Sequence, residues 1–220
     1  MKYVLIVVLF FLSVSFAANA QHAPFYGEIQ TFKKQDSINP PPKHAILFVG
    51  SSSFRKWTDV QQYFPGYTII NRGFGGSTLP DVINYADDII FPYEPKQIVI
   101  YCGENDLATS DTITAATVVN RFKALFFLIR DRLPDVPLVF VALKPSPSRE
   151  KLWPKMEEAN KAIKIFLKKK NNTSFADVYH KMFKRGSLKK GIFIEDNLHM
   201  NANGYAIWQK VINPYLLKDK

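Results

Sequence analysis

The stretch AILFVGSSSFRKW, residues 45–57, passes from five apolar residues to a glycine and then to three consecutive serines. An apolar run of this length without polar alternation is typical of a parallel strand that is buried on both faces. Gly50 permits a sharp turn, and hydroxyl side chains are common where a helix begins. The stretch therefore predicts a buried strand, a tight loop and the start of a helix.

Four further apolar runs predict four more buried strands, each separated from the next by enough chain for a crossover helix. A short segment around residues 25–32 and a triple-proline connector, residues 40–42, precede the first strand. The alternation predicts one α/β domain, a three-layer α/β/α arrangement around a five-stranded, mostly parallel sheet. The predicted strands are residues 45–49, 67–70, 97–101, 138–143 and 174–178, and the predicted helices are residues 115–133, 155–169 and 202–217.

The first 20 residues are expected to be a secretory signal rather than part of the fold. Lys2 precedes an apolar run over residues 3–12, and the small-residue triplet Ala18-Asn19-Ala20 follows it. This order predicts a signal peptide cleaved after Ala20, with residues 21–220 as the mature domain. An uncleaved anchor is the alternative, but the run is short of the about 20 residues that a spanning helix needs. We expect an exported protein, periplasmic or extracellular.

The charge of the chain is placed unevenly. The 29 basic and 19 acidic residues give 29 − 19 = +10, and residues 144–220 carry all of it, with 17 − 7 = +10 against 11 − 12 = −1 for residues 21–143. This basic third is either a solvated face or a contact for an anionic polymer or membrane surface. No nucleic-acid motif accompanies it, so nucleic acid is not an expected partner. One cysteine and four histidines without ligand spacing predict no metal, and we expect no cofactor.

Two functions and one purely structural role compete for the loop of residues 50–57. Free backbone N–H groups and a helix N-terminus favour a bound anion, as in a flavodoxin-like site. The same N–H groups would stabilise the oxyanion formed when a serine attacks a carbonyl. A plain helix cap needs neither function.

Three more loops carry polar chemistry beyond the predicted strands, where ligands of parallel sheets gather. In NRGFGGST, residues 71–78, three glycines leave the backbone N–H groups accessible to a ligand. In CGEND, residues 102–106, the side-chain amide of Asn105 lies beyond the end of the third predicted strand. Cys102 is expected to be packed rather than reactive. In the last loop Asp196 precedes His199 by three residues, so its carboxylate can accept from the imidazole Nδ1–H while Nε2 stays available.

In chain order these four segments resemble the four blocks of the SGNH, or GDSL-type, hydrolases, a family of esterases and lipases. The resemblance covers residues 45–217 and implies the flavodoxin-like SGNH fold. It implies Ser52, Asp196 and His199 as the catalytic residues and Ser52, Gly76 and Asn105 as the oxyanion hole, with no metal.

One position departs from the family pattern. Ser51 stands where the family name has Asp, which leaves Ser52 in register but makes Ser51 and Ser53 formal rivals for the nucleophile. The pattern is similar to bacterial acylhydrolases of the platelet-activating-factor acetylhydrolase type and to carbohydrate acetylesterases. His22, His44 and His180 are expected to have no catalytic role.

The resemblance implies a carboxylic ester hydrolase that works through an acyl-enzyme. Residues 144–154, with Pro145, Pro147, Arg149 and Trp153, are the natural lid, and they hold no long apolar stretch for an acyl chain. We therefore expect a short acyl group such as acetyl, carried on a carbohydrate; a short-chain lipid or lysophospholipid ester is the alternative. The non-enzyme alternative is a flavodoxin-like anion-binding module. The sequence does not predict the oligomeric state.

Overall fold

The apolar run after Ala45 forms strand β1 (Ile46–Gly50), an inner strand of a five-stranded sheet in the computed structural model, which describes residues 23–219. The sheet has the order β2-β1-β3-β4-β5, and every pair of neighbours is parallel. The predicted fold class is therefore confirmed, whereas the predicted signal peptide lies outside the described residues. The other strands are β2 (Ile69–Gly73), β3 (Gln97–Tyr101), β4 (Leu138–Val141) and β5 (Thr173–Ala176).

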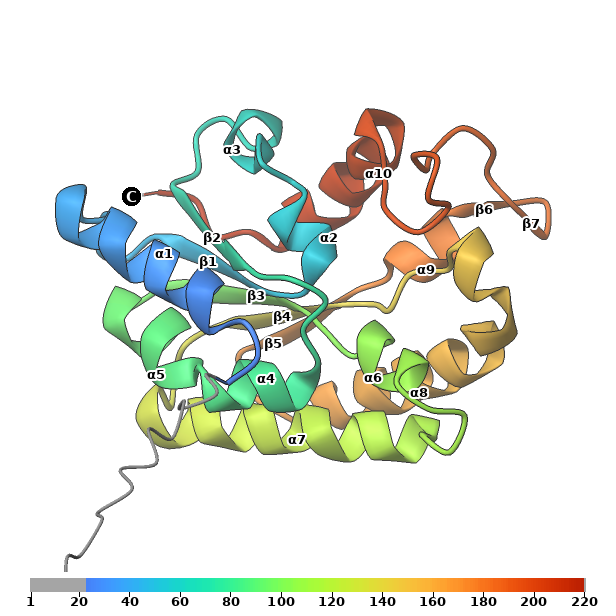
Figure 1. Cartoon of the computed structure of the whole chain (residues 1–220), viewed down its shortest axis with the longest axis horizontal. Helices are drawn as coiled ribbons and strands as arrows, with labels where there is room; N and C mark the ends of the chain where they lie inside the picture. The colour runs from blue at the N-terminus through green and yellow to red at the C-terminus, as the bar shows by residue number, and fades with distance from the viewer. Residues whose placement is uncertain (1–22, 220) are drawn as a thin grey trace, which may run out of the picture.

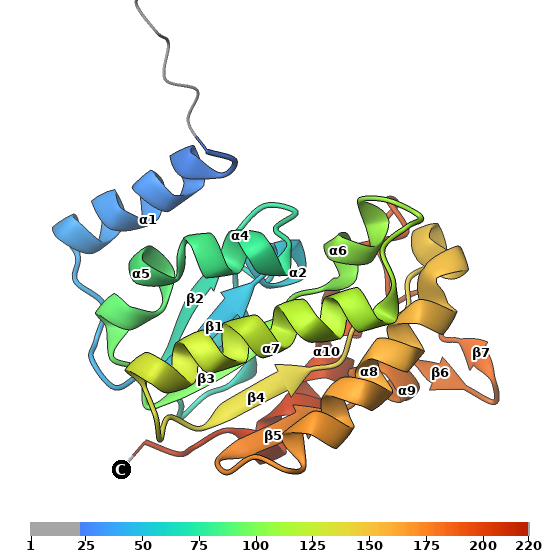
Figure 2. The ribbon, with the colours of Figure 1, turned by 90° about the horizontal axis from the view of Figure 1, so that it is seen from below.

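Helices cover both faces of this sheet (Figures 1 and 2). One face carries α4 (Leu79–Asn84), α5 (Ala86–Ile89), α7 (Ala115–Arg132) and α8 (Trp153–Leu167). The other carries α2 (Ser52–Arg55), α3 (Val60–Tyr63), α9 (Val178–Lys181) and α10 (Ala202–Ile212). The remaining elements are α1 (Tyr26–Ile38), α6 (Glu104–Ala108), the 3₁₀ turns η1 (Phe91–Tyr93), η2 (Pro147–Leu152) and η3 (Asn213–Tyr215), and the hairpin strands β6 (Phe183–Lys184) and β7 (Ser187–Leu188).

An aromatic cluster beneath α2 fixes the turn that follows β1. Trp57 stacks on Tyr205 at 4.7 Å between ring centroids, and Trp208 lies 4.7 Å from Tyr101 at the end of β3. The Tyr205 hydroxyl donates to the backbone carbonyl of Ser53 at 2.8 Å. Because Trp57 and Trp208 are fully buried, this packing holds α2 rigidly against α10.

The sequence reading was wrong at two places near β2. The segment predicted as short, residues 25–32, is the start of the 13-residue helix α1, which lies beside α5. Strand β2 does not end at Ile70 but continues through Asn71 and Arg72 to Gly73, each paired with β1. A polar strand end is tolerated there because Arg72 lies over the rings of Phe32 and Tyr93 and pairs with Asp36.

Among residues 23–219, no helix combines the length and the apolar character needed to cross a bilayer.

Candidate active site

The turn between β1 and α2 presents Ser52 and hides its two neighbours. Gly50 has φ +138°, and a Cβ there would lie 2.0 Å from the carbonyl oxygen of Tyr101, so only glycine fits. Ser51 and Ser53 are each 2% exposed, whereas Ser52 is only partly buried. Of the three consecutive serines, Ser52 is the one whose hydroxyl a substrate can reach.

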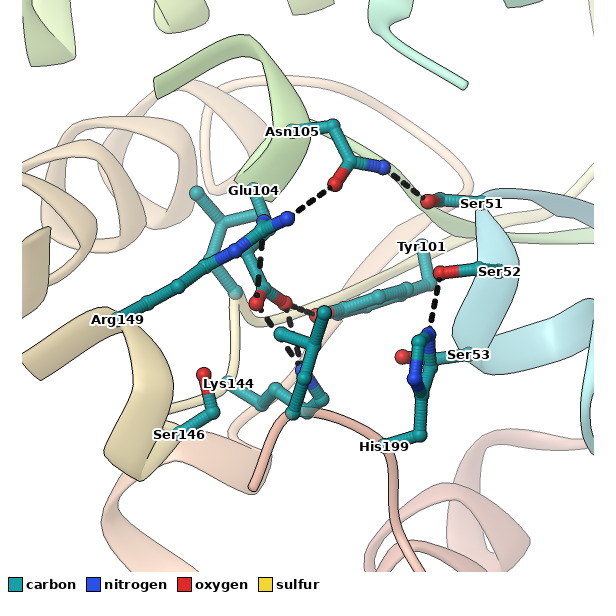
Figure 3. A network of polar contacts seen from close by, with 12 residues as sticks. Ser51, Ser52, Ser53, Tyr101, Glu104, Asn105, Lys144, Ser146, Arg149 and His199 are labelled. Carbon is teal, nitrogen blue, oxygen red and sulfur yellow. Dashed lines mark hydrogen bonds and ion pairs between the residues drawn. The ribbon is translucent and has the colours of Figure 1, made fainter. Parts of the chain in front are cut away.

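Ser52, His199 and Asp196 form a continuous chain of hydrogen bonds. The Ser52 Oγ lies 2.9 Å from His199 Nε2, and His199 Nδ1 lies 2.6 Å from Asp196 Oδ2. Figure 3 shows the imidazole reaching from the last loop toward Ser52 at the start of α2. The structure thus brings Ser52 next to His199, which lies 147 positions away in the sequence, and keeps Asp196 on the other side of the imidazole.

A tight turn holds Asp196 beneath His199. The other carboxylate oxygen, Oδ1, accepts the backbone N–H groups of Leu198 at 2.9 Å and His199 at 2.8 Å. Asn197 adopts φ +53° at the bend, a conformation that asparagine tolerates better than most residues. Partial burial alone would raise the pKa of Asp196, but the hydrogen bonds from His199 and from the backbone outweigh it and lower the pKa to about 2. The carboxylate is therefore ionised at neutral pH and can orient the imidazole.

Asn105 and Gly76 lie on the other side of Ser52. The Asn105 amide nitrogen donates to Ser51 Oγ at 2.6 Å and to the backbone carbonyl of Ser77 at 3.1 Å. A Cβ on Gly76 would lie 3.8 Å from that same nitrogen, and the backbone of Gly76 is exposed. The geometry therefore gathers donor groups next to a partly buried hydroxyl that is hydrogen-bonded to a histidine.

Residues 44–207 match the model of the GDSL-like Lipase/Acylhydrolase family. The chain belongs to the GDSL-like lipase/acylhydrolase family. It is a carboxylic ester hydrolase, and not the anion-binding module that its first loop also allowed. No curated protein matches this hydrolase.

Solved structures of the same fold are distant in sequence. A Streptococcus pneumoniae protein assigned provisionally as a platelet activating factor has 21% identity and a TM-score of 0.75, with 87% of this chain and 92% of that one covered. A GDSL-like lipase from Bacteroides thetaiotaomicron has 18% identity and a TM-score of 0.70, covering 84% and 95%. A catalytic mutant of an acetylxylan esterase from Geobacillus stearothermophilus has 12% identity and a TM-score of 0.64, covering 81% and 96%.

Sequence reasoning missed a buried charged cluster behind Asn105 of this hydrolase. Glu104 is 4% exposed and Lys144 is 1% exposed, and they pair at 2.8 Å. The Tyr101 hydroxyl also donates to Glu104, and Arg149 Nη1 lies 3.3 Å from its carboxylate (Figure 3). Burial alone would raise the pKa of Glu104, but the two cations outweigh it and hold the pKa below its usual range. The signal in the sequence was a pair of opposite charges close behind buried apolar runs, with Lys144 directly after residues 138–143 and Glu104 three residues after Tyr101.

The lid segment, residues 144–154, lies partly inside the protein. Lys144, Pro145 and Ser146 are buried, and the Trp153 indole donates to the carbonyl of Ser146 at 2.9 Å. Pro147 and Arg149 border a cavity of about 710 Å³ between η2 and the end of α6. A second cavity, of about 390 Å³, is lined in part by Trp153, Phe193, Lys189, Lys190 and Asn197.

Cys102, His44 and His180 are the other residues that the sequence analysis singled out within the described part of the chain. Cys102 is fully buried, and that burial raises the pKa of its thiol well above the usual value. His44 precedes β1 and so lies at the strand end opposite to Ser52, His180 lies beside Asp177 and Glu157, and His22 lies outside the described residues. No group of three or more histidine, cysteine, aspartate or glutamate side chains within residues 23–219 is placed to hold a metal ion.

Proposed function

We propose that this hydrolase is an exported serine esterase that removes short acyl groups, chiefly acetyl, from carbohydrate esters. The observation that carries the proposal is the hydrogen-bonded chain from Ser52 Oγ to His199 Nε2 and from His199 Nδ1 to Asp196. A serine becomes a nucleophile when a base accepts its proton, and the base acts well only when a third group orients it. These three residues meet both conditions.

Each step of the proposed reaction has a residue to perform it. His199 takes the proton of Ser52 as the oxygen attacks the ester carbonyl, and the ionised Asp196 stabilises the resulting imidazolium. The backbone N–H groups of Ser52 and Gly76 and the amide of Asn105 receive the oxyanion. His199 then protonates the leaving alcohol, and water repeats the cycle on the acyl-enzyme.

Asn105 must change one of its hydrogen bonds when substrate arrives. Its two amide hydrogens point to Ser77 O and Ser51 Oγ, so neither is vacant in the free enzyme. The oxyanion would displace one of these two neutral acceptors, because a charged acceptor binds more strongly.

The lining of the cavities supports a small acyl group on a polar carrier. The cavity of about 390 Å³ is lined by the aromatic rings of Trp153 and Phe193, by lysines and by Asn197, the residue that directly follows Asp196. Aromatic rings beside polar groups suit a sugar, whose ring has an apolar face and a hydroxyl rim. The likeness to an acetylxylan esterase supports the same class.

A short-chain lipid or lysophospholipid ester is the second candidate. The likeness to a protein assigned as a platelet activating factor favours it. In that case the basic third of the chain would face an anionic membrane surface, and Lys189 and Lys190, which line a cavity together with Asn197, would take part in that contact. Export of the chain rests on the signal-like residues 1–20.

A substrate comparison tests the proposal. The full chain is assayed on p-nitrophenyl acetate and p-nitrophenyl octanoate, and then on acetylated xylan, an acetylated amino sugar and a lysophospholipid. We expect preference for acetyl over octanoyl and for the acetylated saccharides over the lipid, with all activity lost in Ser52→Ala. Ser37→Ala, an exposed serine near the end of α1 whose hydroxyl donates to the carbonyl of Lys34, is the matched control. Faster turnover of octanoyl esters or of the lysophospholipid would overturn the carbohydrate assignment.

A further inference from the structure

Arg149 on η2 makes a contact with the proposed oxyanion donor that the catalytic scheme does not use. Its Nη2 donates to Asn105 Oδ1 at 2.7 Å (Figure 3). A guanidinium has donors only, so it must meet the oxygen of the amide. On the opposite side the carbonyl of Ser77, which is an acceptor only, must meet the nitrogen, at 3.1 Å. The two contacts together leave Asn105 one orientation, with its N–H groups toward Ser51 and Ser77.

We propose that Arg149 is a positioning residue that holds the Asn105 amide in its donating orientation and strengthens its N–H groups. The inference rests on the proposed function, because it assumes that Asn105 stabilises the oxyanion. The hydrogen bond from a charged donor is stronger than the neutral one from Asn105 to Ser77. Donation to the amide oxygen also polarises the amide, which makes its nitrogen a better donor.

Arg149 is itself held in place from behind. Its Nη1 lies 3.3 Å from Glu104, which Lys144 and Tyr101 bind in the buried cluster. Backbone angles of φ −124° and ψ 29° at Arg149 interrupt the 3₁₀ turn η2. The side chain is 17% exposed, so water does not compete strongly for its donors.

Ser148, the residue before Arg149, connects η2 to the turn that carries the catalytic base His199. The backbone N–H of Ser148 donates to the carbonyl of Asn197 at 3.1 Å, in the turn that carries His199. Segment η2 therefore contacts both halves of the site. Ser148 binds the turn that carries His199, and Arg149 binds the oxyanion donor Asn105. This connection fixes the distance between the two halves before substrate binds.

A double-mutant cycle tests the inference with p-nitrophenyl acetate on the full chain. The variants are Arg149→Met, which keeps an apolar stem but no donor, Asn105→Ala, and the two combined. Arg132→Met is the matched control, because Arg132 is an exposed arginine at the far end of α7 that pairs with Asp87 and lies over Phe91. Thermal unfolding of each variant reports whether the fold persists.

We expect Arg149→Met to lower kcat about 10- to 100-fold, somewhat less than the loss of the donor itself, with KM nearly unchanged. In the Asn105→Ala background the same change should lower kcat no further, because nothing remains to position. Arg132→Met should leave kcat unchanged.

Four results would overturn the inference. A raised KM with unchanged kcat would make Arg149 a substrate contact, and an equal loss of kcat in both backgrounds would make it a structural residue. An unchanged kcat and KM in Arg149→Met would give it no role. If Asn105→Ala alone leaves kcat unchanged, the oxyanion assignment fails and this inference fails with it; a loss in Asn105→Ala without the expected coupling overturns the Arg149 role alone.

Discussion

Two segments of the chain place an Asp three residues ahead of a His, and only one of them meets a serine. In both, the carboxylate binds the ring Nδ1, at 2.6 Å from Asp196 to His199 and at 2.9 Å from Asp177 to His180. In both, a carboxylate oxygen also accepts the backbone N–H of the histidine, at 2.8 Å and 3.2 Å. The local geometry of the two pairs is nearly the same.

The difference lies at the other ring nitrogen. His199 Nε2 is 2.9 Å from Ser52 Oγ and its side chain is 12% exposed, whereas His180 Nε2 lies 3.7 Å from Glu157 and its side chain is 63% exposed. Asp177 directly follows β5, which is three strand positions from β1 in the sheet, or roughly 14 Å at the usual strand spacing. The chain must return through residues 182–198 before a histidine can reach Ser52 (Figure 1). A spacing of three residues is thus enough to pair an Asp with a His. Whether the pair can act in catalysis depends on whether the fold brings it to Ser52.

Replacing each histidine by alanine should separate the two pairs most widely. We expect His199→Ala to lower kcat on p-nitrophenyl acetate by about 10⁶-fold, because Ser52 loses its base. His180→Ala should leave kcat unchanged, since its imidazole touches no residue of the site. Similar losses in both variants would show that the distinction drawn from topology is wrong.

Replacing each aspartate by alanine should give a smaller difference in kcat between the two pairs, together with a difference in stability. Asp196→Ala is expected to lower kcat by about 10⁴-fold, because the imidazole loses its orienting partner. Asp177→Ala should leave kcat unchanged but cost about 1 kcal/mol of unfolding free energy, because Asp177 caps α9. Steady-state kinetics and urea unfolding of both variants measure the two effects; a loss of kcat in Asp177→Ala would contradict the comparison.

The pH dependence of stability should give the smallest effect. The folded-state pKa of Asp196, about 2, is lower than its ordinary value of 3.8, so its ionised form stabilises the fold. That stabilisation is complete above about pH 4 and is lost as the pH falls toward about 2. The side chain is 40% exposed, so water screens much of the effect. The stability difference between the wild type and Asp196→Ala should therefore shrink over this pH range, and a difference that grows instead would disprove the pKa ordering.

The sequence predicted the parts of this molecule that depend on apolar patterning. Strand β3 was predicted at the observed residues, 97–101, and the start of α7 at Ala115, because buried runs and helical spacing are local signals. The end of β2 was missed because Asn71 and Arg72 are polar, and their place in the sheet depends on pairing with β1 and on cover from α1. Helix α1 itself has few buried residues to reveal it.

For the site, the chain order of four polar loops indicated which residues would meet. The family pattern pointed to Ser52 but left Ser51 and Ser53 as formal rivals, because the three serines differ in exposure at a turn that Gly50 and Tyr101 shape. The sequence could not reveal Arg149 beside Asn105, since that contact joins η2 to α6 across 44 residues. Spacing predicts pairs within one turn, whereas a contact such as that of Arg149 with Asn105 becomes visible only in the fold.

The most direct test of the account is to find which atom becomes covalently bound during the reaction. The full chain is treated with a p-nitrophenyl alkylphosphonate, which leaves a stable phosphonyl group on an activated serine, and the fragment-ion masses of the labelled peptide locate the adduct among the three consecutive serines. We predict one adduct per chain, on Ser52, with none in Ser52→Ala and a greatly slowed reaction in His199→Ala. An adduct on Ser51 or Ser53, or full esterase activity in a chain that forms no adduct, would contradict the assignment of Ser52 as the nucleophile.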